Sequence, residues 1–166
     1  VRVDDEGHFL FRGLNACLGT FQNGELNTLP PGRWSDTRDL VDVDPRHTST
    51  GVPRYVFVGR ADHDFKLSNG RLVRAARIEA DLREAMPDVQ SAVVVRTGDD
   101  ALGVVLGSGE PSLVVDRAAL ARCLGPMMSR VEHLIVAPLA DLPRTAKGEV
   151  DRATIASHLT HAGVRM

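Results

Sequence analysis

Cysteines, aromatic side chains and long hydrophobic runs are all scarce in this sequence. The 166 residues include two cysteines, and the aromatic content is 4%. Cys17 and Cys123 have no metal-ligand spacing, and two cysteines do not indicate a disulfide scaffold. We therefore expect both to be reduced packing residues of a cytoplasmic protein. The longest apolar runs, such as residues 92–95, have the length of a strand, so the sequence predicts no membrane span.

Charge of either sign is not in excess. The net charge is −2 and the pI is near 6.3. Nucleic-acid-binding domains carry a basic patch, so this balance predicts no nucleic-acid partner. A hydrophobic content of 43% and a charged content of 25% are typical of a globular protein rather than a disordered one. Because the first residue is Val1 rather than Met, we expect the sequence to begin within a longer protein.

Residues 1–60 have the pattern of short strands separated by turns. Asn23-Gly24 is a strong turn signal, and Pro30-Pro31-Gly32 is another. Residues 54–60, "RYVFVGR", predict an apolar strand that ends in a glycine-arginine pair. Helical signals are few here, so this segment is predicted to be rich in β-structure.

Helices alternate with strands in residues 61–166. A stripe of apolar residues at i, i+4 and i+8 predicts an amphipathic helix over 75–86. Asp116 can cap a second helix that ends near Leu124, and a third helix follows the loop 142–152. The order is ββαββαβ-loop-α, which predicts a compact α+β domain with its boundary near Arg60.

Three motifs follow one another along the chain. They are "GRWSDTRDL" (32–40), "GRADHDFKLSNGRLVRAARIEADLREAMPDVQSAVVV" (59–95) and "LPRTAKGEVDR" (142–152). Together they resemble the adenylate-forming superfamily, which includes acyl-CoA synthetases, peptide-synthetase adenylation domains and the adenylation domains of carboxylate reductases. Any one motif alone would be a weak signal, but three in the family's order make a strong one.

The resemblance implies an α+β fold in two parts. Residues 1–60 are expected to be the β-rich end of the large N-terminal domain, and residues 61–166 to be the small, mobile C-terminal α+β domain. In relatives the phosphate-binding loop and the acid-binding pocket lie upstream of this region. The resemblance therefore implies that this chain alone is an incomplete enzyme, and that its partner is the remainder of the adenylation domain.

The resemblance also implies a nucleotide site. Asp39 matches the acid of the family's Thr-Gly-Asp, and its carboxylate suits two adjacent ribose hydroxyls. Arg60 would reach the ribose or a phosphate with its planar guanidinium, and Arg71 is the basic residue that follows the turn. From spacing alone, Asp39 is also suited to end a surface strand, and a charge after a strand is most often solvated. Arg38 replaces the family's glycine, which predicts a reshaped turn or a crowded nucleotide.

Two further features are implied by the second motif. Asp62 falls where the family has the hinge about which the small domain turns. The turn "LSNG" falls where relatives present a face to the thiol arm of the acyl acceptor, and its residues are Ser68, Asn69 and Gly70.

The third motif leaves open which residue is the active lysine. In most relatives the lysine follows the loop's glycine, where this chain has Glu149, and a carboxylate would repel the phosphate. A subgroup that includes carboxylate-reductase-like enzymes resembles both "KLSNG" (66–70) and "TAKG" (145–148), with lysine before the glycine. This interpretation makes Lys147 the active residue. The alternative is a loop that has lost its lysine, and Glu149 is close enough in sequence to pair with Lys147.

The function that the resemblance implies is ligation of a carboxylic acid to a thiol. Its cofactors would be ATP and Mg²⁺, bound mainly by the upstream part, and the acceptor would be coenzyme A or the phosphopantetheine of a carrier protein. No metal site is expected in this chain, because His158 and His161 lack a third ligand. The alternative function is a non-catalytic remnant that docks a partner, which Arg38 and Glu149 favour.

Overall fold

The computed structural model describes residues 1–13, 19–44, 53–110 and 113–162. The chain divides into two compact units, Val1–Asp62 and His63–Met166. The boundary expected near Arg60 lies close to this division, and independent folding of the second unit stays a prediction. Cys17, expected to be a packing residue, lies outside the described residues.

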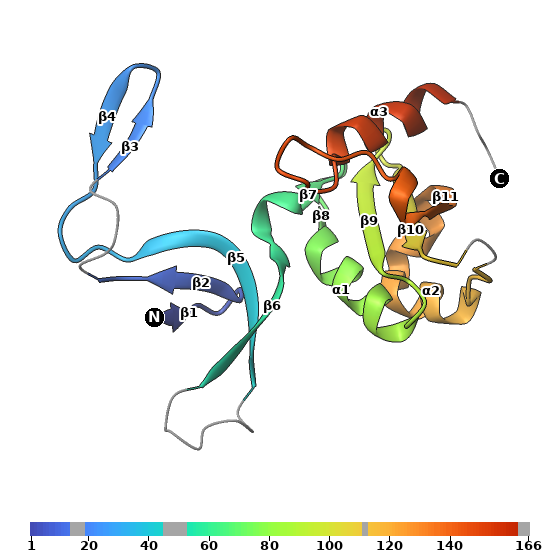
Figure 1. Cartoon of the computed structure of the whole chain (residues 1–166), viewed down its shortest axis with the longest axis horizontal. Coiled ribbons are helices and arrows are strands. Elements are labelled where there is room, and N and C mark those ends of the chain that lie inside the picture. The colour runs from blue at the N-terminus through green and yellow to red at the C-terminus, as the bar shows by residue number, and fades with distance from the viewer. Residues whose placement is uncertain (14–18, 45–52, 111–112, 163–166) are drawn as a thin grey trace. The chain divides into compact units, whose positions relative to one another are not determined.

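The first unit is built around an antiparallel sheet (Figure 1). Its strands pair in the order β1 (Arg2–Val3), β2 (His8–Phe11), β5 (Ser35–Asp44) and β6 (Arg54–Arg60). The strands β3 (Gly19–Gln22) and β4 (Glu25–Thr28) form a separate hairpin. Its turn has Asn23 at φ 53° and Gly24 at φ 84°. These left-handed values are what an Asn-Gly hairpin turn requires, so the turn predicted here is confirmed.

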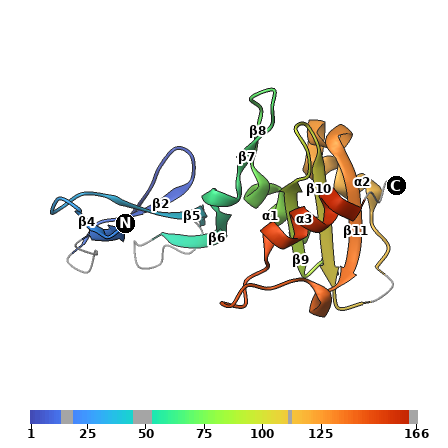
Figure 2. The same cartoon turned by 90° about the horizontal axis from the view of Figure 1, so that it is seen from above.

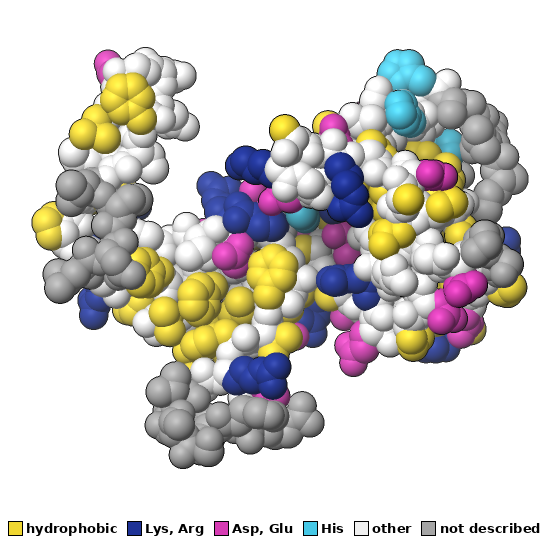
Figure 3. All heavy atoms as spheres, viewed as in Figure 1, with side chains coloured by type: hydrophobic (Ala, Val, Ile, Leu, Met, Phe, Trp, Pro, Cys, Tyr) yellow, Lys and Arg dark blue, Asp and Glu magenta, His cyan; other side chains and the backbone are white. Residues whose placement is uncertain are grey.

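The sheet of the first unit buries little apolar surface of its own. Within the described residues, its buried hydrophobic side chains are those of Leu10, Leu40 and Val58. Hydrophobic side chains lie at the surface of the first unit (Figure 3): Phe57 of β6 is 61% exposed, and Phe21 of the β3–β4 hairpin is 74% exposed. A small buried core predicts low intrinsic stability for this unit, because apolar burial is the main favourable contribution to folding.

The second unit is a three-stranded sheet with helices on both faces (Figure 2). Its elements in chain order are β7 (Phe65–Lys66), β8 (Leu72–Val73), α1 (Ala75–Ala85), β9 (Ser91–Arg96), β10 (Leu102–Ser108), α2 (Arg117–Leu124), β11 (Val131–Pro138) and α3 (Arg152–Ala162). In the sheet β10 is central, antiparallel to β9 and parallel to β11. The predicted order of elements and the α+β class are confirmed.

Alternating side chains of β9 face two different hydrophobic cores. Ala92 and Val94 pack with residues of α1 and α2, whereas Val93 and Val95 pack with residues of α3 and the loop before it. This alternation follows from the two-residue period of a strand, and both faces are apolar because both are covered by helices. The sheet therefore supports α1 and α2 on one side and α3 on the other.

The helix signals of the sequence are confirmed by the side chains. Ile78, Leu82 and Met86 are all buried, as an amphipathic stripe requires. The carboxylate of Asp116 accepts the backbone N–H groups of residues 118 and 119 at 2.8 and 3.0 Å and so caps α2. No helix among the described residues is long and apolar enough to span a bilayer.

Candidate functional site

The motif around Asp39 forms a bulge in the sheet of the first unit. On either side of it, His8 pairs with Leu40 and Leu10 pairs with Asp36. Between these pairs β2 has only Phe9, whereas β5 has residues 37–39, so the longer stretch must leave the regular ladder. A bulge of this kind turns side chains away from the positions that a regular strand would give them.

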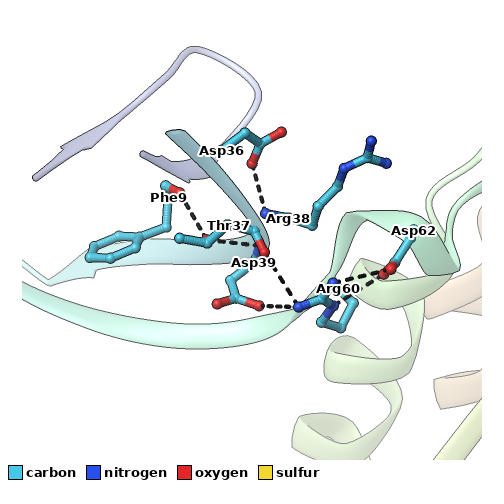
Figure 4. A network of polar contacts seen from close by, with 7 residues as sticks. All are labelled: Phe9, Asp36, Thr37, Arg38, Asp39, Arg60 and Asp62. Carbon is cyan, nitrogen blue, oxygen red and sulfur yellow. Dashed lines mark hydrogen bonds and ion pairs between the residues drawn. The ribbon is translucent and has the colours of Figure 1, made fainter. Parts of the chain in front are cut away.

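Arg38 lies at the centre of the bulge and has a left-handed backbone conformation. Its φ is 64°, a value that glycine adopts readily and other residues seldom do. Its backbone N–H donates to Asp36 Oδ1 at 2.7 Å, and Thr37 Oγ1 donates to the carbonyl of Phe9 at 2.8 Å (Figure 4). Arginine thus takes a left-handed backbone conformation that glycine adopts readily, and reshaping of the turn or crowding of the nucleotide stays a prediction. Its side chain points away from Asp39 (Figure 4).

Asp39 and Arg60 are brought together across β5 and β6. They are direct partners in the ladder, and Arg60 Nη1 donates to Asp39 Oδ1 at 3.1 Å. The same guanidinium holds Asp62 with two hydrogen bonds, of 3.2 and 3.1 Å. These bonds to Asp62 raise the pKa of Arg60 above its already high ordinary value, so the cation persists at any physiological pH. Among the described residues, none donates a hydrogen bond to the other oxygen of Asp39, Oδ2.

The turn that carries the predicted thiol-arm face belongs to the second unit and is exposed. Ser68 Oγ donates to Asp100 Oδ1 at 2.8 Å, and Asn69 Oδ1 accepts the backbone N–H of Arg71 at 2.9 Å. Gly70 has φ 80°, the left-handed value that this tight turn between β7 and β8 needs. These bonds fix the backbone of the turn. Arg71, predicted for the nucleotide site, lies on this turn with an exposed side chain.

The loop that contains Lys147 is closed by backbone hydrogen bonds. From base to tip, its two legs are joined by the pairs Asp151 with Pro143, Val150 with Arg144 and Glu149 with Thr145. At the tip the N–H of Gly148 donates to the carbonyl of Thr145 at 2.9 Å, and Gly148 has φ 81°. Glycine allows this reversal without strain. Lys147 is therefore presented at the end of an ordered two-legged loop.

Lys147 and Glu149 are both exposed and do not pair. Within the part of the chain that the structure describes, no carboxylate lies within 4.0 Å of the Lys147 ammonium. The pairing with Glu149 that the sequence allowed is therefore not found. Lysine occurs only at positions 66 and 147, against 18 arginines. A chain that uses arginine for nearly all of its cations thus has a lysine at the tip of this loop.

Sequence reasoning missed a buried ion pair beside the lysine loop. Glu79 of α1 is 7% exposed, and Arg152, the first residue of α3, binds both of its oxygens at 2.5 and 3.0 Å. Burial raises the pKa of Glu79, whereas the hydrogen bonds and charge of Arg152 oppose that shift. A signal was present: Glu79 lies next to Ile78 on the apolar stripe of its helix, where a charge needs a partner.

Asp64 received no role from the sequence but has one in the structure. Its carboxylate accepts the backbone N–H of Ala76 at 3.2 Å, at the start of α1, where Arg74 provides no side-chain cap. Burial raises the pKa of Asp64 above its ordinary value. His158 and His161 are exposed, and the described residues contain no group of three or more His, Cys, Asp or Glu side chains suited to a metal ion.

Comparison with known proteins finds relatives by sequence and by fold. No family model matches the chain. Triostin synthetase I of Streptomyces triostinicus is 31% identical over 164 residues, which are 93% of this chain and 29% of that protein. The structure of E. coli MenE with a bound analogue of OSB-AMS superposes with a TM-score of 0.63 at 16% identity, over 95% of this chain and 33% of MenE.

A further solved structure has the same fold. It is that of the anthranilate CoA ligase AuaEII in complex with anthranoyl-AMP, with a TM-score of 0.53 at 22% identity over 96% of this chain and 33% of AuaEII. The chain belongs to the adenylate-forming superfamily. It spans 11% to 29% of the length of the curated relatives it matches.

Proposed function

We propose that this chain is the C-terminal part of an enzyme that activates a carboxylic acid with ATP. The enzyme would form an acyl-adenylate and then pass the acyl group to a thiol, either of coenzyme A or of a carrier protein's phosphopantetheine. The superfamily relationship supports carboxylate activation in general. The geometry of individual residues of this chain supports the more specific assignment, which is acyl-adenylate formation followed by transfer to a thiol.

The observation that carries the proposal is the presentation of Lys147. Its ammonium lies at the tip of an ordered loop, is exposed, and is not neutralised by Glu149. A compact cation suits a site where negative charge builds up as a carboxylate attacks a phosphate. We therefore assign to Lys147 the stabilisation of that charge in the adenylation step.

The residues of the first unit fit the sugar of a bound nucleotide. Arg60 fixes Asp39 through Oδ1, and Oδ2 accepts no hydrogen bond from the described residues. A carboxylate held in this way has free acceptor capacity for ribose hydroxyls. When bound, ATP supplies the adenylyl group, and Asp39 and Arg60 orient it. Arg71 is proposed to assist at the nucleotide, and Asp62 to act as the hinge.

The acceptor side of the proposal rests on the turn Ser68-Asn69-Gly70. It is exposed and its backbone is fixed by hydrogen bonds, as a docking face for a thiol arm requires. Coenzyme A and a carrier protein both end in phosphopantetheine, so both would present the same arm to this turn.

The alternative function is a non-catalytic remnant that docks a partner. Two residues favoured it, namely Arg38 and Glu149. Arg38 takes a left-handed conformation that glycine also adopts readily, and Glu149 does not pair with Lys147, so neither feature counts against catalysis as strongly as the sequence indicated.

The experiment that separates the two functions uses the enzyme that contains this chain together with the rest of the fold. Lys147→Ala is expected to slow acyl-adenylate formation by roughly 10²- to 10³-fold, the usual effect of removing one preorganised electrostatic contact. Pyrophosphate exchange measures this step. Transfer to the thiol from ready-made acyl-adenylate is expected to survive, since Lys147 is assigned to adenylation alone.

Two controls sharpen the experiment. Arg117→Ala removes an exposed cation from α2 and is expected to leave both steps unchanged. Glu149→Ala is expected to be neutral or mildly activating, because it removes a negative charge close in sequence to Lys147. If Lys147→Ala has no effect while Glu149→Lys activates an otherwise inactive enzyme, the loop has lost its lysine and the remnant function is favoured.

A further inference from the structure

The Glu79–Arg152 pair joins three elements of the second unit at one point. Arg152 at the start of α3 binds both oxygens of Glu79 on α1, and its Nη2 also donates to the carbonyl of Val94 on β9 at 2.6 Å. Glu79 Oε1 in turn accepts the N–H of Val94 at 2.6 Å. The two side chains thus form a closed network with the backbone of Val94, in the middle of the edge strand β9.

Stability alone does not account for this network. A buried ion pair is typically no more stabilising than well-packed apolar residues of similar volume. Arg152 is also placed unfavourably, because a cation in the first turn of a helix is opposed by the helix dipole. The pair instead restricts the relative orientation of its two side chains, because a planar guanidinium that binds both oxygens of a carboxylate allows one arrangement.

The pair lies directly beside the base of the loop that contains Lys147. Arg152 directly follows Asp151, whose N–H donates to the carbonyl of Pro143 at the base of the loop. The other leg begins at Leu142, which is buried in the core under α3. Leu142 packs where Gly107 of β10 has no side chain, since a Cβ at Gly107 would lie 2.7 Å from Leu142 Cδ1. Both legs are therefore attached to the central sheet.

We propose that Glu79 and Arg152 are positioning residues for Lys147, which hold its loop in a fixed orientation on the sheet of the second unit. This inference rests on the proposed role of Lys147 in adenylation. It implies that Lys147 is moved by the second unit as a whole and not by flexing of its own loop.

The first test measures the loop itself, in the chain of residues 1–166. Amide hydrogen exchange is followed for Thr145, Gly148 and Asp151, whose N–H groups close the loop. Arg152→Lys loses the two-pronged contact and is expected to accelerate their exchange about tenfold, as expected when a locally stabilising contact is lost. Asp81→Asn, which breaks the exposed Arg77–Asp81 pair on the same helix α1, is expected to leave it unchanged.

The second test measures catalysis in the complete enzyme. Glu79→Leu combined with Arg152→Met replaces the pair by apolar side chains, so that the unit can keep its stability. Adenylation is expected to slow by roughly 10- to 100-fold, because a misplacement of about 1 Å has effects of this size. Thiol transfer from supplied acyl-adenylate is expected to be unchanged. In a Lys147→Ala background the double substitution is expected to slow adenylation no further.

The outcomes separate this inference from the proposed function. An equal fall in both steps, or an equal fall with and without Lys147, would show that the pair is only structural. Unchanged amide exchange in the loop of the Arg152→Lys chain would also overturn the inference. If Lys147→Ala alone has no effect, the proposed function fails, and the exchange experiment still decides whether the pair holds the loop.

Discussion

At position 38 an arginine adopts a backbone conformation that usually belongs to glycine. Its φ of 64° lies in the left-handed region, where the Cβ of an ordinary residue crowds the following carbonyl oxygen. The conformation persists because its surroundings fix it: Arg38 N–H donates to Asp36, and the neighbouring Thr37 is tied to Phe9 of β2. The strain at Arg38 is thus linked to the bulge that places Asp39 beside Arg60.

Arg38→Gly is therefore expected to stabilise the first unit. Relief of the left-handed strain contributes about 1–2 kcal/mol, and the greater freedom of glycine in the unfolded chain opposes it by about 0.5–1 kcal/mol. The net gain in the free energy of unfolding is expected to be roughly 0.5–1 kcal/mol. Because this unit is expected to need the upstream part of the adenylation domain, the measurement uses the complete protein, with the tryptophans outside this chain replaced by phenylalanine. Urea unfolding followed by the fluorescence of Trp34, the single tryptophan of this chain, then reports on this unit.

Arg33→Gly is the matched control for that measurement. Arg33 is an exposed arginine in the turn before Trp34, and it does not have a positive φ. Glycine there adds freedom to the unfolded chain without relieving strain, so it is expected to lower stability. If both glycine variants lower the free energy of unfolding equally, Arg38 is not strained.

Elements with local signals were predictable from the sequence. The stripe of α1, the Asp116 cap of α2 and the Asn23-Gly24 turn each depend on residues a few positions apart, and all three are found. The partnership of Glu79 with Arg152 was not predictable, because 73 residues separate them and only the packing of α1 and α3 on β9 brings them together. The two motifs containing these residues were recognised, but their contact was not.

Asp151 has a capping role at the start of α3 that depends on pH. Its carboxylate accepts the N–H and the hydroxyl of Thr154 at 3.0 and 2.8 Å, and these bonds lower the pKa of Asp151 below its ordinary 3.8. A carboxyl with a lowered folded-state pKa contributes stability above its unfolded-state pKa, and loses that contribution as the pH falls through the folded-state pKa.

Asp151→Ala is therefore expected to lower the Tm of the chain at pH 7. The difference in Tm from the parent chain is expected to shrink as the pH falls below 3.8, because the parent then loses the same contribution. Thermal unfolding followed by circular dichroism at several pH values measures this difference. Asp88→Ala, at an exposed carboxylate after α1, is expected to change Tm little at any pH. A Tm difference that does not depend on pH would show that the charge of the Asp151 carboxylate does not contribute to capping.

The two units of the whole molecule differ in how much apolar surface they bury. The second unit has two hydrophobic clusters, one on each face of its sheet, whereas the described part of the first unit buries Leu10, Leu40 and Val58 alone. The first unit also exposes large side chains such as Phe21 and Phe57. Domains that bury little apolar surface are marginally stable by themselves.

The piece His63–Met166 is therefore expected to fold by itself, and Val1–Asp62 is expected to need the upstream part of the adenylation domain. The division between Asp62 and His63 cuts through the 3₁₀ turn Ala61–His63, which contains no buried residue, so separation should expose little core. A dispersed amide NMR spectrum and a cooperative thermal transition are expected for His63–Met166, and neither for Val1–Asp62.

Limited proteolysis of the whole chain is expected to cut near residues 61–63 and to leave the second unit intact. Cleavage within residues 75–106 instead, or an unfolded His63–Met166 piece, would show that the second unit depends on the first. The Glu79–Arg152 pair and the Lys147 loop would then owe their geometry to both units, and the second unit could not carry Lys147 as an independent body.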